Sequence, residues 1–304
     1  HEVNVWEEMV DWLDSDAYAD LLDEQGQGVH VVMPPTTSPT TLAAIERFKE
    51  GSFPMAQFHT WTPLNMDSEL QGAEMAFGRP MLTHYEFGKA DVVVTLDNDF
   101  LGSDGDSIRS SIQWGNRRAE AKDLNRLYAI ESTYTGTGVA ADHRFRTKSS
   151  EIPAVAFALA KELGVGVGSE LEAALAPHSA AAFVKKGEKW LEVIAKDLQS
   201  AKGKSIVVAG ATQPPVVHAI AHAINAKLNS FGETVTLTEV PPGIPSDCAD
   251  QLKGLASAIE TGSCQTLIFI GTNPVYNAPA DLRFADLLSN CLLYTSDAAD
   301  DRVS

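Results

Sequence analysis

Short apolar runs of strand length alternate along this chain with segments that carry apolar residues at helical spacing. Helix patterns of about a dozen residues are clearest at 40–50, 152–163, 216–228 and 252–259. Uniformly apolar strands that alternate with helices are typical of parallel sheets covered on both faces. The sequence therefore predicts an α/β fold with doubly wound parallel sheets. The strand-like runs cover residues 29–33, 91–96, 126–130, 205–209, 234–238 and 267–270.

The strand–helix alternation restarts near residue 205, and a chain of 304 residues is long enough for about two domains. We therefore expect two consecutive α/β units joined by a helical linker. The predicted parts are an N-terminal helical segment (1–27), a first α/β unit (28–165), the linker (166–204) and a truncated second α/β unit (205–290).

Both ends of the chain have unusual features. The chain begins at His1 without an initiator Met, and residues 281–288 form a helix pattern with no Gly or Pro stop after it. Residues 291–304 resemble the translation of a sequencing-library transposon adapter. We expect this closing segment to be an artefact and the chain to be an internal piece of a longer protein; a genuine acidic tail is the alternative.

The composition argues against several classes of partner and site. The net charge of -18 disfavours binding to a phosphate backbone, so we expect no nucleic-acid partner. No apolar stretch approaches the roughly 18 residues of a membrane helix, so we expect no direct membrane span. Cys248, Cys264 and Cys291 are widely separated and form no CxxC pair, which argues against a zinc ribbon or an iron–sulfur cluster within this segment.

Small and polar residues follow most of the predicted strands. In open α/β sheets, ligands bind beyond the carboxyl ends of the strands, and such residues let backbone N–H groups approach an anion. Ordinary turns between a strand and a helix need the same residue types, so no single loop identifies a site. None of the loops matches GxGxxG or a Walker P-loop. The loops are 34–37, 97–102, 131–135, 210–213 and 271–276.

Four aspartates lie within ten residues after the second predicted strand, at 97, 99, 104 and 106. Their spacing does not match an EF-hand calcium loop, which needs alternating ligands and a glutamate at the twelfth position. We expect a solvated loop in which Asp106 or Ser107 caps the following helix.

His218 and His222 stand four residues apart, which is a spacing that metal ligands use on a helix. Their neighbours are Ile and Ala, and the glutamate of a zinc protease motif is missing. The sequence therefore favours a partly buried helix face over a metal site.

Three blocks taken together resemble one protein family. They are KADVVVTLDNDFLG (89–102), AIESTYTGTGVAADHR with KSSEI (129–144 and 148–152), and LIFIGTNPVYNAPAD (267–281). Their order and spacing are similar to those of the molybdopterin oxidoreductase superfamily, and most similar to the large iron–sulfur subunit of bacterial alternative complex III. The resemblance covers about residues 28–290 and implies two α/β units of molybdopterin-oxidoreductase type.

In catalytic members of that superfamily, two such units hold a molybdopterin guanine dinucleotide and a molybdenum or tungsten ion. The resemblance makes Gly271, Thr272 and Asn273 candidates for the loop that contacts the dinucleotide. It also matches the segment from Thr135 to Asp142 to the guanine side of the site, so these five residues are the candidate, vestigial cofactor-binding residues.

This chain departs from the catalytic pattern at two places. Residues 131–133 read Glu-Ser-Thr where catalytic members commonly have Asp-Pro-Arg, which removes a cation available to phosphate. Residues 149–151 read Ser-Ser-Glu in place of Gly-Thr-Asp, and the first 247 residues contain no Cys. These departures fit the alternative complex III subunit, whose molybdopterin-like half has lost the cofactor.

The resemblance implies a cofactor-free scaffold within a respiratory, quinol-oxidising electron-transfer subunit, with no catalytic residue and no metal ligand in this segment. Iron–sulfur clusters are expected in a C-terminal part that lies outside this chain. The implied partners are a multihaem cytochrome and polytopic membrane subunits, and the implied location is the outer, periplasmic face of the cytoplasmic membrane.

Two other functions remain open at this stage. A catalytic molybdenum or tungsten oxidoreductase that carries the dinucleotide would need positively charged strand-end loops. An unrelated small-molecule α/β enzyme would have Asp97, Asp99 and His218 as its starting points.

Overall fold

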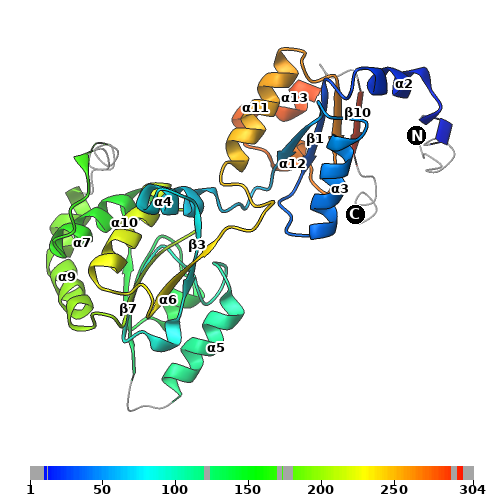
Figure 1. Cartoon of the computed structure of the whole chain (residues 1–304). Helices are drawn as coiled ribbons and strands as arrows, with labels where there is room; N and C mark the ends of the chain where they lie inside the picture. Colours follow the sequence, from blue (N-terminus) through cyan, green and yellow to red (C-terminus); the bar gives the residue numbers. More distant parts are fainter. Residues whose placement is uncertain are drawn as a thin grey trace. The chain divides into compact units, whose positions relative to one another are not determined.

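The computed structural model describes residues 10, 11, 13–119, 124–169, 173, 181–288 and 293–296 (Figure 1). The chain divides into unit 1, made of His1–Asn65 and Pro241–Ser304, and unit 2, made of Met66–Val240. The α/β class predicted from the sequence is confirmed, because both units contain a parallel sheet flanked by helices.

Unit 2 is built on a four-stranded parallel sheet, here called sheet C. Its strands are β4 (Val92–Leu96), β5 (Arg126–Glu131), β6 (His143–Arg146) and β7 (Ser205–Ala209). Their spatial order is β6-β5-β4-β7, and all three pairings are parallel. The chain builds outward from β4 to β6 and then returns to the other side of β4, so the order reverses between β4 and β7. Such a switch point leaves a crevice at the carboxyl ends of the two strands.

Alternate residues of sheet C face two different cores. Val92, Val94 and Leu96 pack with residues of the helices α7, α9 and α10. Val93 packs on the opposite face with Trp114 of α5. Successive side chains of a strand point to opposite faces of the sheet. All five residues of β4 are buried because helices cover both faces. The helices of unit 2 are α4 (Asp67–Phe77), α5 (Ser107–Arg118), α6 (Gly136–Ala140), α7 (Ile152–Glu162), α9 (Ala181–Ser200) and α10 (Pro215–Lys227), with short 3₁₀ turns η1 (Phe87–Lys89) and η2 (Ser149–Glu151).

A two-stranded antiparallel ribbon completes unit 2. It pairs β3 (Met81–Tyr85) with β8 (Val235–Glu239), in register from Met81–Glu239 to Tyr85–Val235. The sequence pattern located β8 correctly to within one residue, but its antiparallel partner β3 was not predicted.

Unit 1 carries a second parallel sheet, sheet A, in the order β10-β9-β1-β2. Val32, Leu267 and Phe269 face a core shared with α11, while Val29 and Val31 face Phe53 on the other side. The strands are β1 (Val29–Met33), β2 (Gln57–Thr60), β9 (Thr266–Phe269) and β10 (Leu293–Ser296), and the helices are α2 (Asp16–Asp23), α3 (Pro39–Glu50), α11 (Cys248–Glu260), α12 (Pro274–Asn277) and α13 (Phe284–Leu288), with the 3₁₀ turn η3 (Ala280–Leu282).

This division differs from the two consecutive units predicted from the sequence. Unit 2 is an insertion between β2 and α11 of unit 1, because β1 pairs with β9 and β4 pairs with β7. The expected linker, 166–204, instead contains α9, whose Leu191, Ile194 and Leu198 are buried in the core of unit 2. Part of that expected linker, and most of 291–304, lie outside the described residues.

Smaller features agree with the sequence pattern. Asp106 is the N-cap of α5, and its carboxylate accepts a hydrogen bond from the backbone N of Arg109, as predicted. The helix pattern at 281–288 is divided between η3 and α13. Within the part of the chain that the structure describes, no helix is long and apolar enough to cross a bilayer.

Candidate functional site at the carboxyl edge of sheet C

The polar loops after β4, β5 and β7 meet at one edge of sheet C. Gly210, directly after β7, donates its backbone N–H to the carbonyl of Leu96 at 2.9 Å. The side-chain nitrogen of Asn98 donates to the carbonyl of Ala209 at 3.1 Å. A Cβ at Gly210 would overlap the backbone of Asp97, so the close approach of these loops requires glycine there.

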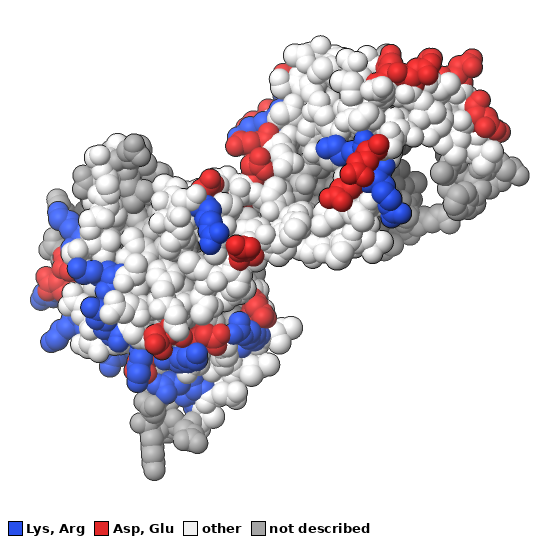
Figure 2. All heavy atoms as spheres, in the orientation of Figure 1, with Lys and Arg blue, Asp and Glu red and all other residues white. Residues whose placement is uncertain are grey.

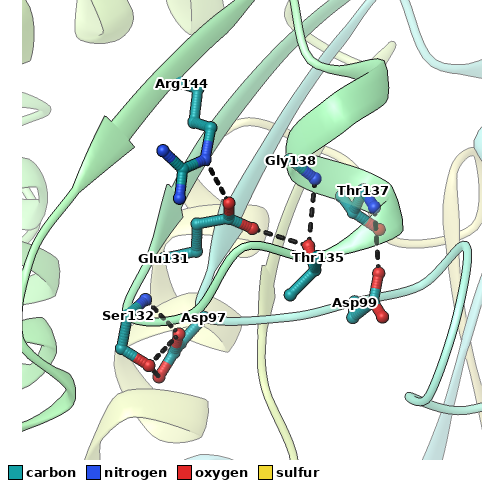
Figure 3. Close-up of polar contacts among 8 residues, drawn as sticks. All are labelled: Asp97, Asp99, Glu131, Ser132, Thr135, Thr137, Gly138 and Arg144. Atoms are coloured by element: carbon teal, nitrogen blue, oxygen red, sulfur yellow. Dashed lines mark hydrogen bonds and ion pairs between the residues drawn. The ribbon is translucent and has the colours of Figure 1, made fainter.

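The carboxylate of Asp97 contacts Ser132, in the loop after β5 (Figure 3), and Gln213, in the loop after β7. The backbone N of Ser132 donates to Oδ1 at 2.7 Å, and the hydroxyl of the same serine donates at 2.9 Å. Gln213 donates its side-chain N–H to Oδ2 at 2.8 Å and also reaches the hydroxyl of Ser149 at 2.8 Å. Asp97 itself has φ 61°, a left-handed conformation that aspartate tolerates better than most residues. Its carboxylate therefore holds the loops together.

Asp99, in the loop after β4, accepts a hydrogen bond from the backbone at the first turn of the short helix α6 (Figure 3). Its Oδ1 accepts the backbone N–H of Thr137 at 2.9 Å, and its Oδ2 accepts that of Ser103 at 3.2 Å. Burial alone would raise the pKa of Asp99, but hydrogen bonds from Thr137, Ser103 and Thr135 outweigh it and hold the pKa below its usual value. The chain's own carboxylate thus takes N–H groups that an anion could otherwise use.

Glu131, at the end of β5, is a buried carboxylate with a cationic partner (Figure 3). Its side chain is 2% exposed and accepts hydrogen bonds from Nε of Arg144 and from the hydroxyl of Thr135, the latter at 2.6 Å. The Thr135 hydroxyl oxygen in turn accepts the backbone N–H of Gly138 at 3.0 Å. Thr135 therefore caps α6 and orients Glu131 at the same time.

The structure separates Thr135 from Asp142, the two ends of the segment matched to the guanine side. Thr135 lies at the carboxyl edge, whereas Asp142 lies just before β6 at the amino edge. There the Asp142 carboxylate accepts the backbone N–H of Leu127 at 2.8 Å and pairs with Arg118. Asp142 therefore joins β5 and β6, while Thr135 remains at the predicted edge.

Most of the cations paired in unit 2 gather at the amino edge of sheet C rather than at its carboxyl edge. Figure 2 shows Lys and Arg interspersed with Asp and Glu on the lower side of this unit, and on unit 1 it shows acidic side chains over α2. At the carboxyl edge, Arg144 is paired with Glu131, and Arg109, in the first turn of α5, is paired with Glu86. The amino-edge pairs are Arg117–Asp91, Lys204–Asp91, Arg118–Asp142 and Arg126–Asp197.

The other three candidate residues follow β9 in unit 1, so they belong to a different sheet from Thr135. Gly271 has φ 61°, and a Cβ there would lie 3.8 Å from the ring of Pro34, at the end of the neighbouring β1. Thr272 is half-buried and Asn273 is exposed. Asn273 precedes α12, which has only four residues and therefore offers an anion little of a helix dipole.

Both histidines of α10 are buried, as predicted. Burial, in each case the largest cause, lowers the pKa of His218 and of His222 to about 4. The two imidazoles lie on one helix face, but the described residues contain no group of three His, Cys, Asp or Glu side chains that could hold a metal ion.

The sequence pattern did not single out the cavity at the β4/β7 switch point. It encloses about 130 Å³ and is lined by side chains from α4, β3, the loop after β4 and α10. Glu69 and Tyr85 contribute to it, and nothing in their local sequence distinguishes them from ordinary helix and strand residues. His218 and Asp104 also line this cavity.

No protein-family model and no curated protein matches the chain. Among solved structures, acetylene hydratase from Pelobacter acetylenicus is similar with a TM-score of 0.60 and 10% identity, covering 96% of this chain and 49% of that one. A chain of the formyltransferase/hydrolase complex (FhcABCD) from Methylorubrum extorquens, solved with methylofuran, is similar with a TM-score of 0.55 and 16% identity, covering 95% and 79%. The chain thus spans about half the length of acetylene hydratase. At these identities the likeness concerns the fold alone.

Proposed function

We propose that this chain is a cofactor-free, molybdopterin-oxidoreductase-like scaffold segment of a respiratory, quinol-oxidising electron-transfer subunit of the alternative complex III type. The family resemblance of three sequence blocks supports this proposal, and the likeness of fold to acetylene hydratase is compatible with it.

The observation that carries the proposal is the occupation of the carboxyl edge of sheet C by the chain's own carboxylates. Dinucleotide phosphates need backbone N–H groups and cations. Here Asp97 takes the N–H of Ser132, and Asp99 takes those of Thr137 and Ser103. Among the described guanidinium groups at this edge, that of Arg144 is paired with the buried Glu131 and that of Arg109 with Glu86, while Arg146, the last residue of β6, is exposed. Pyrophosphate would have to displace these carboxylates against their like charge, so the residues of unit 2 do not fit the dinucleotide.

The acidic edge also argues against the catalytic alternative, which needs positively charged strand-end loops. In this proposal, the segment binds a multihaem cytochrome and polytopic membrane subunits on the outer face of the cytoplasmic membrane. Its iron–sulfur clusters would belong to sequence beyond this chain.

The test is to purify the product of the intact gene with its native assembly and to assay pterin fluorescence after oxidation, molybdenum, tungsten, iron and haem. We expect iron and haem without pterin, molybdenum or tungsten. About one molybdenum or tungsten ion and two pterins per chain would overturn the proposal.

A second measurement addresses the site directly. Guanosine diphosphate is titrated into the wild type and into the double variant Asp97→Asn/Asp99→Asn, which removes two negative charges without changing side-chain size. We expect no saturable binding to the wild type, whereas tight binding to the wild type would contradict the role assigned to these carboxylates.

A further inference from the structure

The residues that line the cavity at the switch point between β4 and β7 include two with a buried hydrogen-bond acceptor that has no donor among the described residues. Open α/β sheets bind ligands at this position, outside the carboxyl ends of the strands. The cavity of about 130 Å³ lies entirely within unit 2. It is large enough for a ligand of a few heavy atoms.

His218 lines this cavity and carries a buried acceptor atom. Its side chain is 5% exposed, and its ring donates a hydrogen bond to the backbone carbonyls of Gly210 and Gln213. Nε2 has no hydrogen-bond partner among the described residues. The ring proton therefore resides on Nδ1, and Nε2 is an acceptor without a donor.

Asn98 presents a second unmatched acceptor. Its amide nitrogen donates to the carbonyl of Ala209 at 3.1 Å, which fixes the orientation of the amide. Its Oδ1 is buried and, within the part of the chain that is described, has no donor. Two buried acceptors without donors cost free energy unless a ligand or water satisfies them.

Two carboxylates in the same cavity define the charge that would complement it. Burial and the charge of Asp104 raise the pKa of Glu69 to about 7, against a hydrogen bond from the backbone of Thr83. Burial likewise raises the pKa of Asp104, although the backbone N of Asp99 donates to its Oδ2 at 2.8 Å. The cation that lines the cavity, Arg109, is paired with Glu86 outside it.

We propose that this cavity binds a small primary ammonium cation, whose N–H groups are shared among the carboxylates of Glu69 and Asp104, Nε2 of His218 and Oδ1 of Asn98. An ammonium group supplies a positive charge and N–H donors to these acceptors, whereas the guanidinium of Arg109 in the lining is already paired with Glu86. The site is independent of the proposed scaffold function, because it uses none of the residues assigned to the dinucleotide.

The experiment titrates methylammonium chloride into the full chain by calorimetry, with tetramethylammonium chloride and sodium chloride at the same ionic strength as controls. Tetramethylammonium has the same charge but no N–H donor. We expect saturable binding of methylammonium alone, and a loss of about tenfold or more in affinity in Glu69→Gln and in His218→Phe. His222→Phe is the matched control, because His222 lies one turn further along α10 and does not line this cavity.

A second readout covers the case in which His218→Phe fails to fold. The ¹⁵N resonance of His218 Nε2 in the wild type should move on addition of methylammonium, while that of His222 should not. Absence of saturable binding, equal binding of tetramethylammonium, or undiminished binding by Glu69→Gln would overturn the proposal and leave water as the occupant.

Discussion

Gly138 allows the buried carboxylate of Glu131 to lie against α6, so Gly138→Ala is a direct test of the carboxyl-edge packing. A Cβ at Gly138 would overlap both oxygens of Glu131, at 2.5 Å from Oε2. Glu131 cannot move aside freely, because its carboxylate is held by Arg144 and by the hydroxyl of Thr135. Gly136→Ala is the matched control in the same helix, since its Cβ would meet only Asp99 Oδ1, at 3.8 Å.

The size of the effect follows from two terms. Forcing extra atoms into a packed site costs about 1–3 kcal/mol, and breaking a buried ion pair costs about 3–5 kcal/mol. Replacing glycine by alanine in a helix returns about 1 kcal/mol, but that gain is common to both variants and cancels in their difference. With partial relaxation of Glu131, we expect Gly138→Ala to be less stable than Gly136→Ala by about 2–4 kcal/mol.

The assay is urea unfolding followed by circular dichroism and by fluorescence of Trp114 and Trp190, which both lie in unit 2. Gly138→Ala combined with Glu131→Ala should be no less stable than Glu131→Ala alone, because the overlap is then gone. Equal stability of Gly138→Ala and Gly136→Ala would refute the reasoning, since it would mean that Glu131 is not held where the structure places it.

Three further predictions concern unit 2. Gly115→Ala in α5 should raise the free energy of unfolding by about 1 kcal/mol, because alanine favours the helix over glycine and its Cβ would meet no atom within 4 Å. An unchanged urea midpoint would contradict this. Gly72→Ala should lower the free energy of unfolding by about 1–3 kcal/mol, because the new Cβ would lie 2.7 Å from the carbonyl oxygen of Pro215 and overlap His218. A melting temperature equal to that of the wild type would contradict this. The raised pKa of Glu69 means that the folded state holds this proton more tightly than the unfolded state, so its contribution to stability is complete below pH 4.5 and is lost as the pH rises through about 7. Glu69→Gln should remove that loss of about 3 kcal/mol, as measured by urea unfolding between pH 4.5 and 8. Parallel pH profiles of the unfolding free energy for variant and wild type would exclude it.

Local patterns were sufficient to locate most of the secondary structure. The strands at 29–33 and 205–209 have the predicted bounds, and Asp106 caps α5 as expected. These features depend on residues within one strand or one helical turn, which a single sequence displays directly. The strand β6 was missed because its residues, His-Arg-Phe-Arg, are half-buried or exposed and lack the apolar run of a central strand.

The candidate site was only partly accessible from the sequence. The resemblance led to Thr135 at the carboxyl edge of sheet C, but it also named Asp142, which lies at the opposite edge of the same sheet. The cavity at the switch point combines Glu69, Asn98 and His218 from three separate elements. No local spacing connects these residues, because they meet only through the pairing of β4 with β7.

The sequence by itself determined the α/β class and the positions of the buried strands, because hydrophobic periodicity is a local property of the chain. Only the tertiary structure decided which strands pair. Residues 92–96 pair with 205–209, and 29–32 pair with 266–269, so one unit is inserted into the other. Long-range pairings of similar apolar strands have no distinct local signal, since any of them can bury the same residues. The packing of helices between the strands therefore selects the partner, and with it the side chains that gather at each edge of the sheet.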